Sequence, residues 1–235
     1  MATTVNKQRL LTHLLSGLGK PGKAGEPESR PVLEQFVYSL CREGTTRELA
    51  DQAFVALRDR FYDWNEIRVS SAREVADAID MLPGCDARAQ RIIEFLSEVF
   101  ETTFSFDLEG LHKKGLKQAA KQLARYQRAN DYGVAWVVQQ SLGGHAIPLD
   151  APTLRVLRRV GLIEEDGQDL ESLRAGLEHL IPKVRGPQFA DTISEVAQEY
   201  CWKDDPQCPS CPLAECCVTA QELRASGEFA GRKPR

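Results

Sequence analysis

The chain has 235 residues and a mass of 26.2 kDa, which is enough for one large domain or two small ones, each with a buried core. With 42% hydrophobic and 27% charged residues, its composition excludes the disordered and fibrous classes. The formal charge of −4 does not by itself indicate a nucleic-acid partner.

Residues 1–30 are predicted to form a short amphipathic helix and a flexible linker. The apolar segment Leu10–Leu15 is interrupted by Thr12 and His13, so it is far shorter than the ~18 residues of a membrane span. Four glycines and two prolines between Ser16 and Arg30 predict the linker. The start of the chain lacks the features of a secretory signal, so we expect a soluble, cytoplasmic protein without a membrane partner.

From Pro31 onward almost every segment shows the helical period, and β-branched runs are few. Helix-start signals recur: capping boxes at Thr45–Glu48 and Ser71–Glu74, a capping aspartate at Asp86, and a first-turn proline at Pro187. We therefore expect an all-α protein with about nine or ten helices, more than a simple bundle contains.

A basic stripe is predicted between Leu111 and Asn130, a segment with six basic residues and no acidic ones. Four of them recur every four residues and would share one face of a helix: Lys113, Lys117, Lys121 and Arg125. Such a stripe suits a phosphate backbone, although a solvated helix face has the same pattern.

Five of the seven cysteines lie between Cys201 and Cys217. Four have the spacing C-x6-C-x2-C-x5-C: Cys201, Cys208, Cys211 and Cys217. Clustered thiolates in a reducing compartment indicate an iron–sulfur cluster or zinc, but zinc sites usually pair two close knuckles and this segment has one. We predict a [4Fe-4S] cluster, with Cys216 as a bystander.

This spacing resembles the cluster loop of the endonuclease III branch of the helix-hairpin-helix DNA glycosylases, and the resemblance extends from about Pro31 to Cys217. It implies two helical domains with a DNA-binding cleft between them. Residues 31–144 would form the six-helix domain with a degenerate hairpin. Residues 145–217 would form the iron–sulfur domain, against which residues 1–30 pack, and residues 218–235 would be a tail.

The segment IPLDAPTLRVLRR resembles the family's catalytic region and places Asp150 at the position of its aspartate. The resemblance implies that this carboxylate orients the attacking water and stabilises positive charge on the sugar. An aspartate before a helix is also a good N-cap, and the two roles are compatible.

A gapless count back from Asp150 puts Tyr132 where bifunctional relatives have a lysine. Without an amine at this position no Schiff base forms, so the resemblance implies a monofunctional glycosylase in which Tyr132 contacts the lesion. Arg128 and Asn130 stand where the family's hairpin has glycines, and we predict that both contact DNA.

Two other segments resemble the hairpin. Leu111–Ala119 would offer Lys117 as the amine, but Lys117 lies 33 residues before Asp150, too far for the family pattern. Leu82–Ala89 fits a turn between two earlier helices, and there Arg88 is a candidate DNA contact. Further predicted phosphate contacts are Lys121, Arg125 and Arg155, with Arg158 and Arg159 beside them.

Glu43 or Gly44 stands where relatives usually insert a glutamine into the duplex. A carboxylate has the wrong charge for that place, so a changed substrate is expected. The leading hypothesis is a base-excision-repair glycosylase that acts as a monomer on double-stranded DNA, nucleoid-associated if bacterial. The alternative is a catalytically silent iron–sulfur DNA-binding protein with the same fold.

Overall fold

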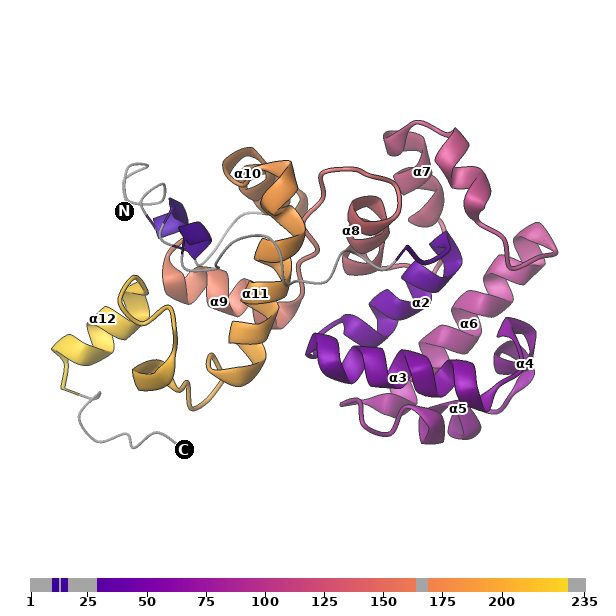
Figure 1. Ribbon diagram of the computed structural model, residues 1–235, viewed down its shortest axis with the longest axis horizontal. Helices are drawn as coiled ribbons and strands as arrows, with labels where there is room; N and C mark the ends of the chain where they lie inside the picture. Colours follow the sequence, from indigo (N-terminus) through magenta and orange to yellow (C-terminus); the bar gives the residue numbers. More distant parts are fainter. Residues whose placement is uncertain (1–9, 13, 17–28, 164–168, 228–235) are drawn as a thin grey trace. The chain divides into compact units, whose positions relative to one another are not determined.

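The computed structural model describes residues 10–12, 14–16, 29–163 and 169–227, and all their regular elements are helices (Figure 1). This confirms the predicted all-α class. The chain divides after Pro148 into two compact units, where the sequence predicts a boundary after residue 144. The hairpin unit comprises residues 29–148. The cysteine unit comprises residues 10–12, 14–16 and the described residues from Leu149 onward. The predicted linker, apart from its ends, lies outside the described residues.

The hairpin unit contains seven α-helices and a 3-10 helix in its described residues. They are α2 (Val32–Arg42), α3 (Arg47–Arg60), α4 (Trp64–Val69), α5 (Ala72–Ala78), α6 (Cys85–Thr103), η1 (Glu109–Lys113), α7 (Leu116–Leu123) and α8 (Asp131–Gln140).

The core of the hairpin unit surrounds α2, in which every residue except Glu34 is buried. This helix contacts α3, α6 and α8, which Figure 1 shows around it. The rings of Phe36 and Phe95 stack with their centroids 4.0 Å apart, which joins α2 to α6. Because α2 is buried on nearly all sides, it is the helix around which the others assemble.

The three capping signals named in this unit predict the starts of α3, α5 and α6 to within one or two residues. The capping box of Ser71 and Glu74 is confirmed. The expected cap at Thr45 is wrong by one residue, because Thr46 accepts the hydrogen bond from the Leu49 amide. Asp86 is not the cap of α6, which already begins at Cys85, after Gly84 in the left-handed conformation with φ of 68°. Glycine adopts this conformation without strain, so the turn before α6 ends at Gly84, two residues before the expected cap at Asp86.

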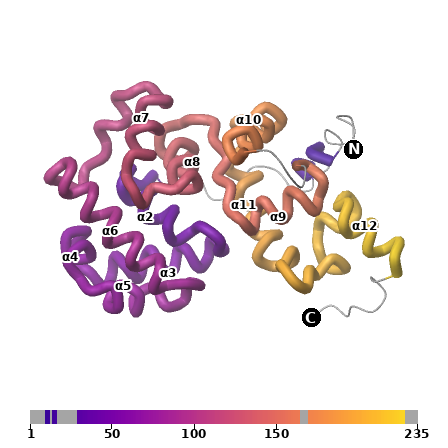
Figure 2. The backbone as a smooth tube through the Cα atoms, turned by 180° about the vertical axis from the view of Figure 1, so that it is seen from behind, coloured from indigo at the N-terminus to yellow at the C-terminus, as the bar shows by residue number. Residues whose placement is uncertain are grey.

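The cysteine unit contains α9 (Ala151–Val160), α10 (Leu170–Leu180), η2 (Lys183–Arg185), α11 (Gly186–Glu199), η3 (Cys208–Ser210) and α12 (Val218–Ala225). Pro187 lies in the first turn of α11, as predicted. Figure 2 shows α9 beside both α11 and α12. A Cβ atom on Gly161, which ends α9, would lie 2.8 Å from Val218, so glycine permits this close approach. The predicted tail thus begins with a helix.

Among the described residues, no helix has the length and hydropathy required to cross a membrane.

Candidate functional site

The hairpin unit contains a helix–hairpin–helix made of α7, the loop 124–130 and α8. The buried ring of Tyr126 in this loop packs edge-on against Phe95 of α6, with centroids 5.6 Å apart. A Cβ atom on Gly133 of α8 would lie 3.0 Å from the Ser39 hydroxyl of α2. The loop is therefore anchored to α6, and the helix after it packs closely on α2.

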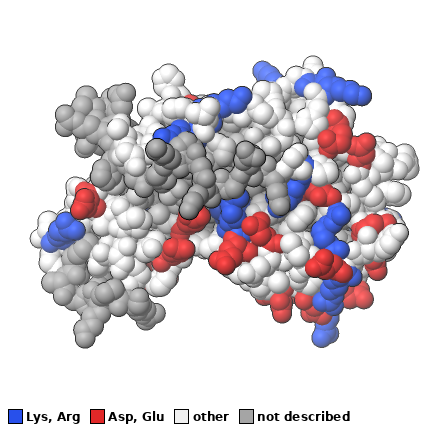
Figure 3. All heavy atoms as spheres, in the orientation of Figure 1, with Lys and Arg blue, Asp and Glu red and all other residues white. Residues whose placement is uncertain are grey.

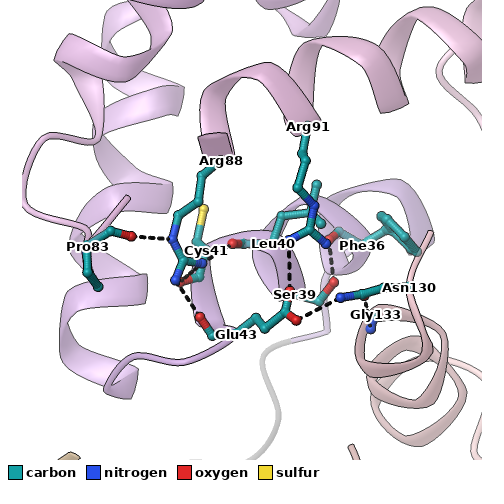
Figure 4. A network of polar contacts seen from close by, with 10 residues as sticks. All are labelled: Phe36, Ser39, Leu40, Cys41, Glu43, Pro83, Arg88, Arg91, Asn130 and Gly133. Atoms are coloured by element: carbon teal, nitrogen blue, oxygen red, sulfur yellow. Dashed lines mark hydrogen bonds and ion pairs between the residues drawn. The ribbon is translucent and has the colours of Figure 1, made fainter. Parts of the chain in front are cut away.

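Asn130 connects the hairpin to the loop after α2 (Figure 4). Its side-chain oxygen accepts a hydrogen bond from the Gly133 amide at 2.9 Å and so caps α8. Its amide nitrogen donates to a Glu43 carboxylate oxygen at 2.7 Å, and Arg91 binds the other oxygen at 3.0 Å. Glu43, one of the two residues at the position where relatives insert a glutamine, is thus held by two partners within its own unit.

Arg88, a predicted DNA contact, points to backbone carbonyls around the end of α2 (Figure 4). Its guanidinium donates to the carbonyls of Leu40 at 2.5 Å, Glu43 at 2.5 Å and Pro83 at 2.9 Å. Burial is the main cause that lowers the pKa of this guanidinium. In this arrangement the group closes the carboxyl end of a helix, where a cation is favourable.

Tyr132, the predicted lesion contact, is 5% exposed. Its ring stacks on Trp136 with centroids 6.1 Å apart, and the Trp136 indole donates to the Gln35 side chain at 2.9 Å. The structure therefore places Tyr132 among aromatic side chains between α8 and α2.

The predicted basic residues are exposed, but they do not share one helix as the sequence predicts: Lys113 ends η1, Lys117 and Lys121 lie in α7, and Arg125 lies in the loop after α7. Within the part of the hairpin unit that the structure describes, none of these four side chains forms an ion pair. Figure 3 shows basic side chains along the edge of the molecule over α7. Lys114 instead donates to Gln122 at 2.5 Å. This surface can bind anions without first breaking an internal ion pair.

Arg128 differs from the stripe because it pairs with Glu94 of α6. Beside it, the backbone amide of Gln127 donates to both carboxylate oxygens of Glu98, at 3.0 and 2.8 Å. Neither glutamate is among the residues that the sequence predicts for the site. The four-residue interval between them indicates one acidic helix face, but nothing in the sequence indicates that this face meets the hairpin.

In the cysteine unit, Asp150 is the N-cap of α9 and is 7% exposed. Its carboxylate accepts a hydrogen bond from the Thr153 amide at 2.8 Å, and the Thr153 hydroxyl accepts one from the Asp150 amide at 2.9 Å. The predicted cap is confirmed, and the second hydrogen bond completes a capping box. Capping fixes this carboxylate at the positive end of the helix.

Two arginines of α9 support the segment that leads into the cysteines. Arg155 donates to the carbonyls of Cys201 at 2.7 Å and Ala197 at 3.1 Å. Arg159 donates to the Trp202 and Lys203 carbonyls at 2.6 and 2.8 Å and lies 3.4 Å from the Cys201 sulfur. Arg155, a predicted phosphate contact, thus has internal partners at the end of α11.

The four predicted ligands line one pocket with about 350 Å³ of empty space: Cys201, Cys208, Cys211 and Cys217. The rest of its lining is mainly apolar and comes from α9, α11, α12 and the cysteine loop. The pKa values of Cys211 and Cys217 rise to about 11, chiefly through burial, and the neighbouring cysteines contribute in the same direction. Within the described residues, no three His, Cys, Asp or Glu side chains form a ready site for a single metal ion.

Cys216 is not part of the pocket lining. Its thiol donates to the Leu213 carbonyl at 3.3 Å, and burial raises its pKa. This placement agrees with the prediction that Cys216 is a bystander to the four-cysteine set.

No protein-family model and no curated protein sequence matches the chain. An endonuclease III trapped covalently on DNA superposes with a TM-score of 0.67 at 18% identity, covering 92% of this chain and 98% of its own. A thermostable thymine-DNA glycosylase gives a TM-score of 0.65 at 16% identity, with 94% and 100% coverage.

A third solved structure is the 3-methyladenine DNA glycosylase of H. pylori bound to 1,N6-ethenoadenine. It gives a TM-score of 0.61 at 13% identity and covers 83% of this chain and 97% of its own. Identities this low establish the fold and not the reaction. The chain therefore has the endonuclease III-like fold of the helix-hairpin-helix DNA glycosylases, as its sequence predicts.

Proposed function

We propose that this chain is a monofunctional DNA glycosylase of base-excision repair, which extrudes a damaged or mismatched base and hydrolyses its N-glycosidic bond. The observation that carries the proposal is Asp150, a nearly buried carboxylate held by a capping box at the start of α9. Solved structures with the same fold include a thymine-DNA glycosylase and a 3-methyladenine DNA glycosylase.

In this proposal the Asp150 carboxylate has two tasks. It stabilises the positive charge that develops on the sugar as the base leaves, and it orients the attacking water. Its hydrogen bond from the Thr153 amide holds one carboxylate oxygen in place, so little reorganisation is required during the reaction.

We propose that the four cysteines of the pocket hold a [4Fe-4S] cluster. The donor set fits, because four thiolates satisfy such a cluster and the pocket around them is apolar. A single zinc ion would instead need all four sulfurs about 2.3 Å from one point. With four cysteine ligands the cluster leaves no iron open for substrate, so it supplies structural support to the loop between α11 and α12.

The proposed partner is the phosphate backbone of double-stranded DNA, bound by a monomer. Lys121 and Arg125 of the unpaired stripe are the primary contacts, because they retain their full charge toward solvent. Arg128 and Asn130 contribute from the hairpin. Arg88 and Arg155 act mainly by positioning, since their guanidinium groups already hold backbone carbonyls.

A catalytically silent DNA-binding protein is the second candidate, and two observations favour it. The ring of Tyr132 is buried against Trp136, and Glu43 is held by Asn130 and Arg91. Neither residue as placed reaches out toward a flipped base or a duplex.

Base release separates the candidates. Duplexes that carry uracil, thymine glycol, an alkylated purine, or mismatched thymine or adenine would be incubated with the protein and then with hot alkali, which cleaves abasic sites. For the substrate that is released, Asp150→Asn should lose about 100-fold or more of the activity and keep its DNA affinity. Asparagine caps a helix as well as aspartate does, so the fold should survive.

The matched control is Asp169→Asn. Asp169 is the N-cap of α10 in the same unit and accepts from the Ser172 amide at 2.9 Å, so this change removes the same charge from an equivalent cap. It should leave base release unchanged. DNA binding without release from any of these duplexes would contradict the glycosylase and support the silent binder.

A further inference from the structure

The hairpin loop carries an anion-binding arrangement that is already occupied by side chains of the same unit. The Gln127 amide donates to both oxygens of Glu98, at 3.0 and 2.8 Å, and Arg128 pairs with Glu94. Both glutamates come from α6, one turn apart. A backbone amide next to a guanidinium is a pair of donors that binds carboxylate and phosphate oxygens alike.

These contacts lie at the surface. Glu94, Glu98, Glu101, Gln127 and Arg128 line an open depression with about 720 Å³ of empty space. The side chain of Arg128 is 48% exposed, and its partner Glu94 is 30% exposed. Ion pairs in such surroundings are weak and exchangeable, so a competing anion can reach the same donors.

The charge around the loop points to a nucleic-acid competitor. Lys117, Lys121 and Arg125 lead along α7 into the loop and are exposed without ion pairs, as described above. A polyanion can contact this stripe and the hairpin donors at the same time, whereas a small free anion can contact only one of them. The loop is held in place for such a contact by Tyr126, packed against Phe95.

We propose that the hairpin is a phosphate-binding site held closed by the two carboxylates of α6. A DNA phosphate must displace Glu98 from the backbone amide of Gln127 and Glu94 from Arg128 before the hairpin can bind it. The two glutamates therefore lower the affinity for undamaged DNA. This inference rests on the DNA binding in the proposed function.

The test compares Glu98→Gln with Glu101→Gln in the full-length chain. Glutamine at position 98 can still accept from the Gln127 amide, so the hairpin should keep its fold, but it competes poorly with phosphate. Glu101 lines the same depression and has no hydrogen bond or ion pair among the described residues. Its replacement removes the same charge without opening the hairpin.

Affinity for a short undamaged duplex would be measured by fluorescence anisotropy between about 50 and 200 mM salt. Glu98→Gln should bind about threefold to tenfold more tightly at the lower salt, because the backbone amide of Gln127 is then available to a phosphate oxygen. Glu101→Gln should gain about twofold at most, an effect that screening removes as the salt rises. Equal gains from both variants would overturn the inference and leave the proposed function untouched.

A second measurement uses Arg128→Gln in two backgrounds. In the native chain the loss of the Glu94 ion pair offsets most of the contact that Arg128 makes with phosphate, so Arg128→Gln should change DNA affinity by less than about twofold. In the Glu94→Gln/Glu98→Gln background it should cost about tenfold, because Arg128 then faces the phosphate directly. An equal cost in both backgrounds would contradict the inference. Failure of every variant to bind DNA at low salt would contradict the proposed function as well.

Discussion

At the residue scale, the identity of one side chain decides whether the reaction uses water or forms a Schiff base with the sugar. The gapless count back from Asp150 assigns Tyr132 to the position of the family's lysine, and the hairpin loop contains no lysine. We predict that sodium borohydride traps no covalent adduct between this protein and a duplex with a preformed abasic site, because an imine requires an amine. The measurement is a denaturing gel of the labelled duplex, with a bifunctional glycosylase as the positive control. An adduct that Lys117→Ala abolishes would show that Lys117 is the catalytic amine and that the assignment of Tyr132 is wrong.

The same residue shows where sequence reasoning stops. The assignment of Tyr132 to the lysine position follows from a count back from Asp150. An aromatic residue suits a protein core and a binding cleft equally well, so its type does not show where the ring lies. Its stack on Trp136 depends on a helix from the other end of the unit, since the Trp136 indole is held by Gln35 of α2. Contacts of this kind join residues about a hundred positions apart, so no local pattern could predict them.

At the element scale, Asn130 joins the start of α8 to the loop after α2. We predict that Asn130→Asp retains the cap but destabilises the protein by about 1–2 kcal/mol at pH 7, because two carboxylates replace the hydrogen bond to Glu43. Repulsion raises the pKa values of this pair in the folded state. The loss relative to the native chain is therefore smallest near pH 4 and grows as the pH rises through those values.

The measurement for this variant is urea unfolding at several pH values. Asn130→Ser is the control, because a serine hydroxyl also caps the helix but adds no charge. Its loss of stability should be independent of pH over the same range. A pH-independent loss in Asn130→Asp would mean that the contact between Asn130 and Glu43 does not form in solution.

Helix starts were the most predictable elements because their signals are local. The Ser71–Glu74 box and the Asp150 cap each use a side chain and an amide three residues apart. Glu43 was expected to be unsuited to a duplex, and that expectation followed from charge alone. Its partners Asn130 and Arg91, and the closure of the hairpin by Glu94 and Glu98, come from distant segments and became visible only in the fold.

At the scale of the whole molecule, a cofactor would link the loop after α11 to α9 and α12. We predict that Cys208→Ser yields a protein with little bound iron, no brown colour and a thermal unfolding midpoint lowered by at least several degrees, because one cluster ligand is lost.

Cys216→Ser is the matched control: it changes the same atom next to Cys217, outside the pocket lining, and should keep colour, iron content and stability. Iron and sulfide analysis with visible absorption checks both variants. Full iron content in Cys208→Ser, or its loss in Cys216→Ser, would show that a different set of cysteines holds the cluster. Zinc in place of iron in the native chain would show that the cofactor itself is wrongly assigned.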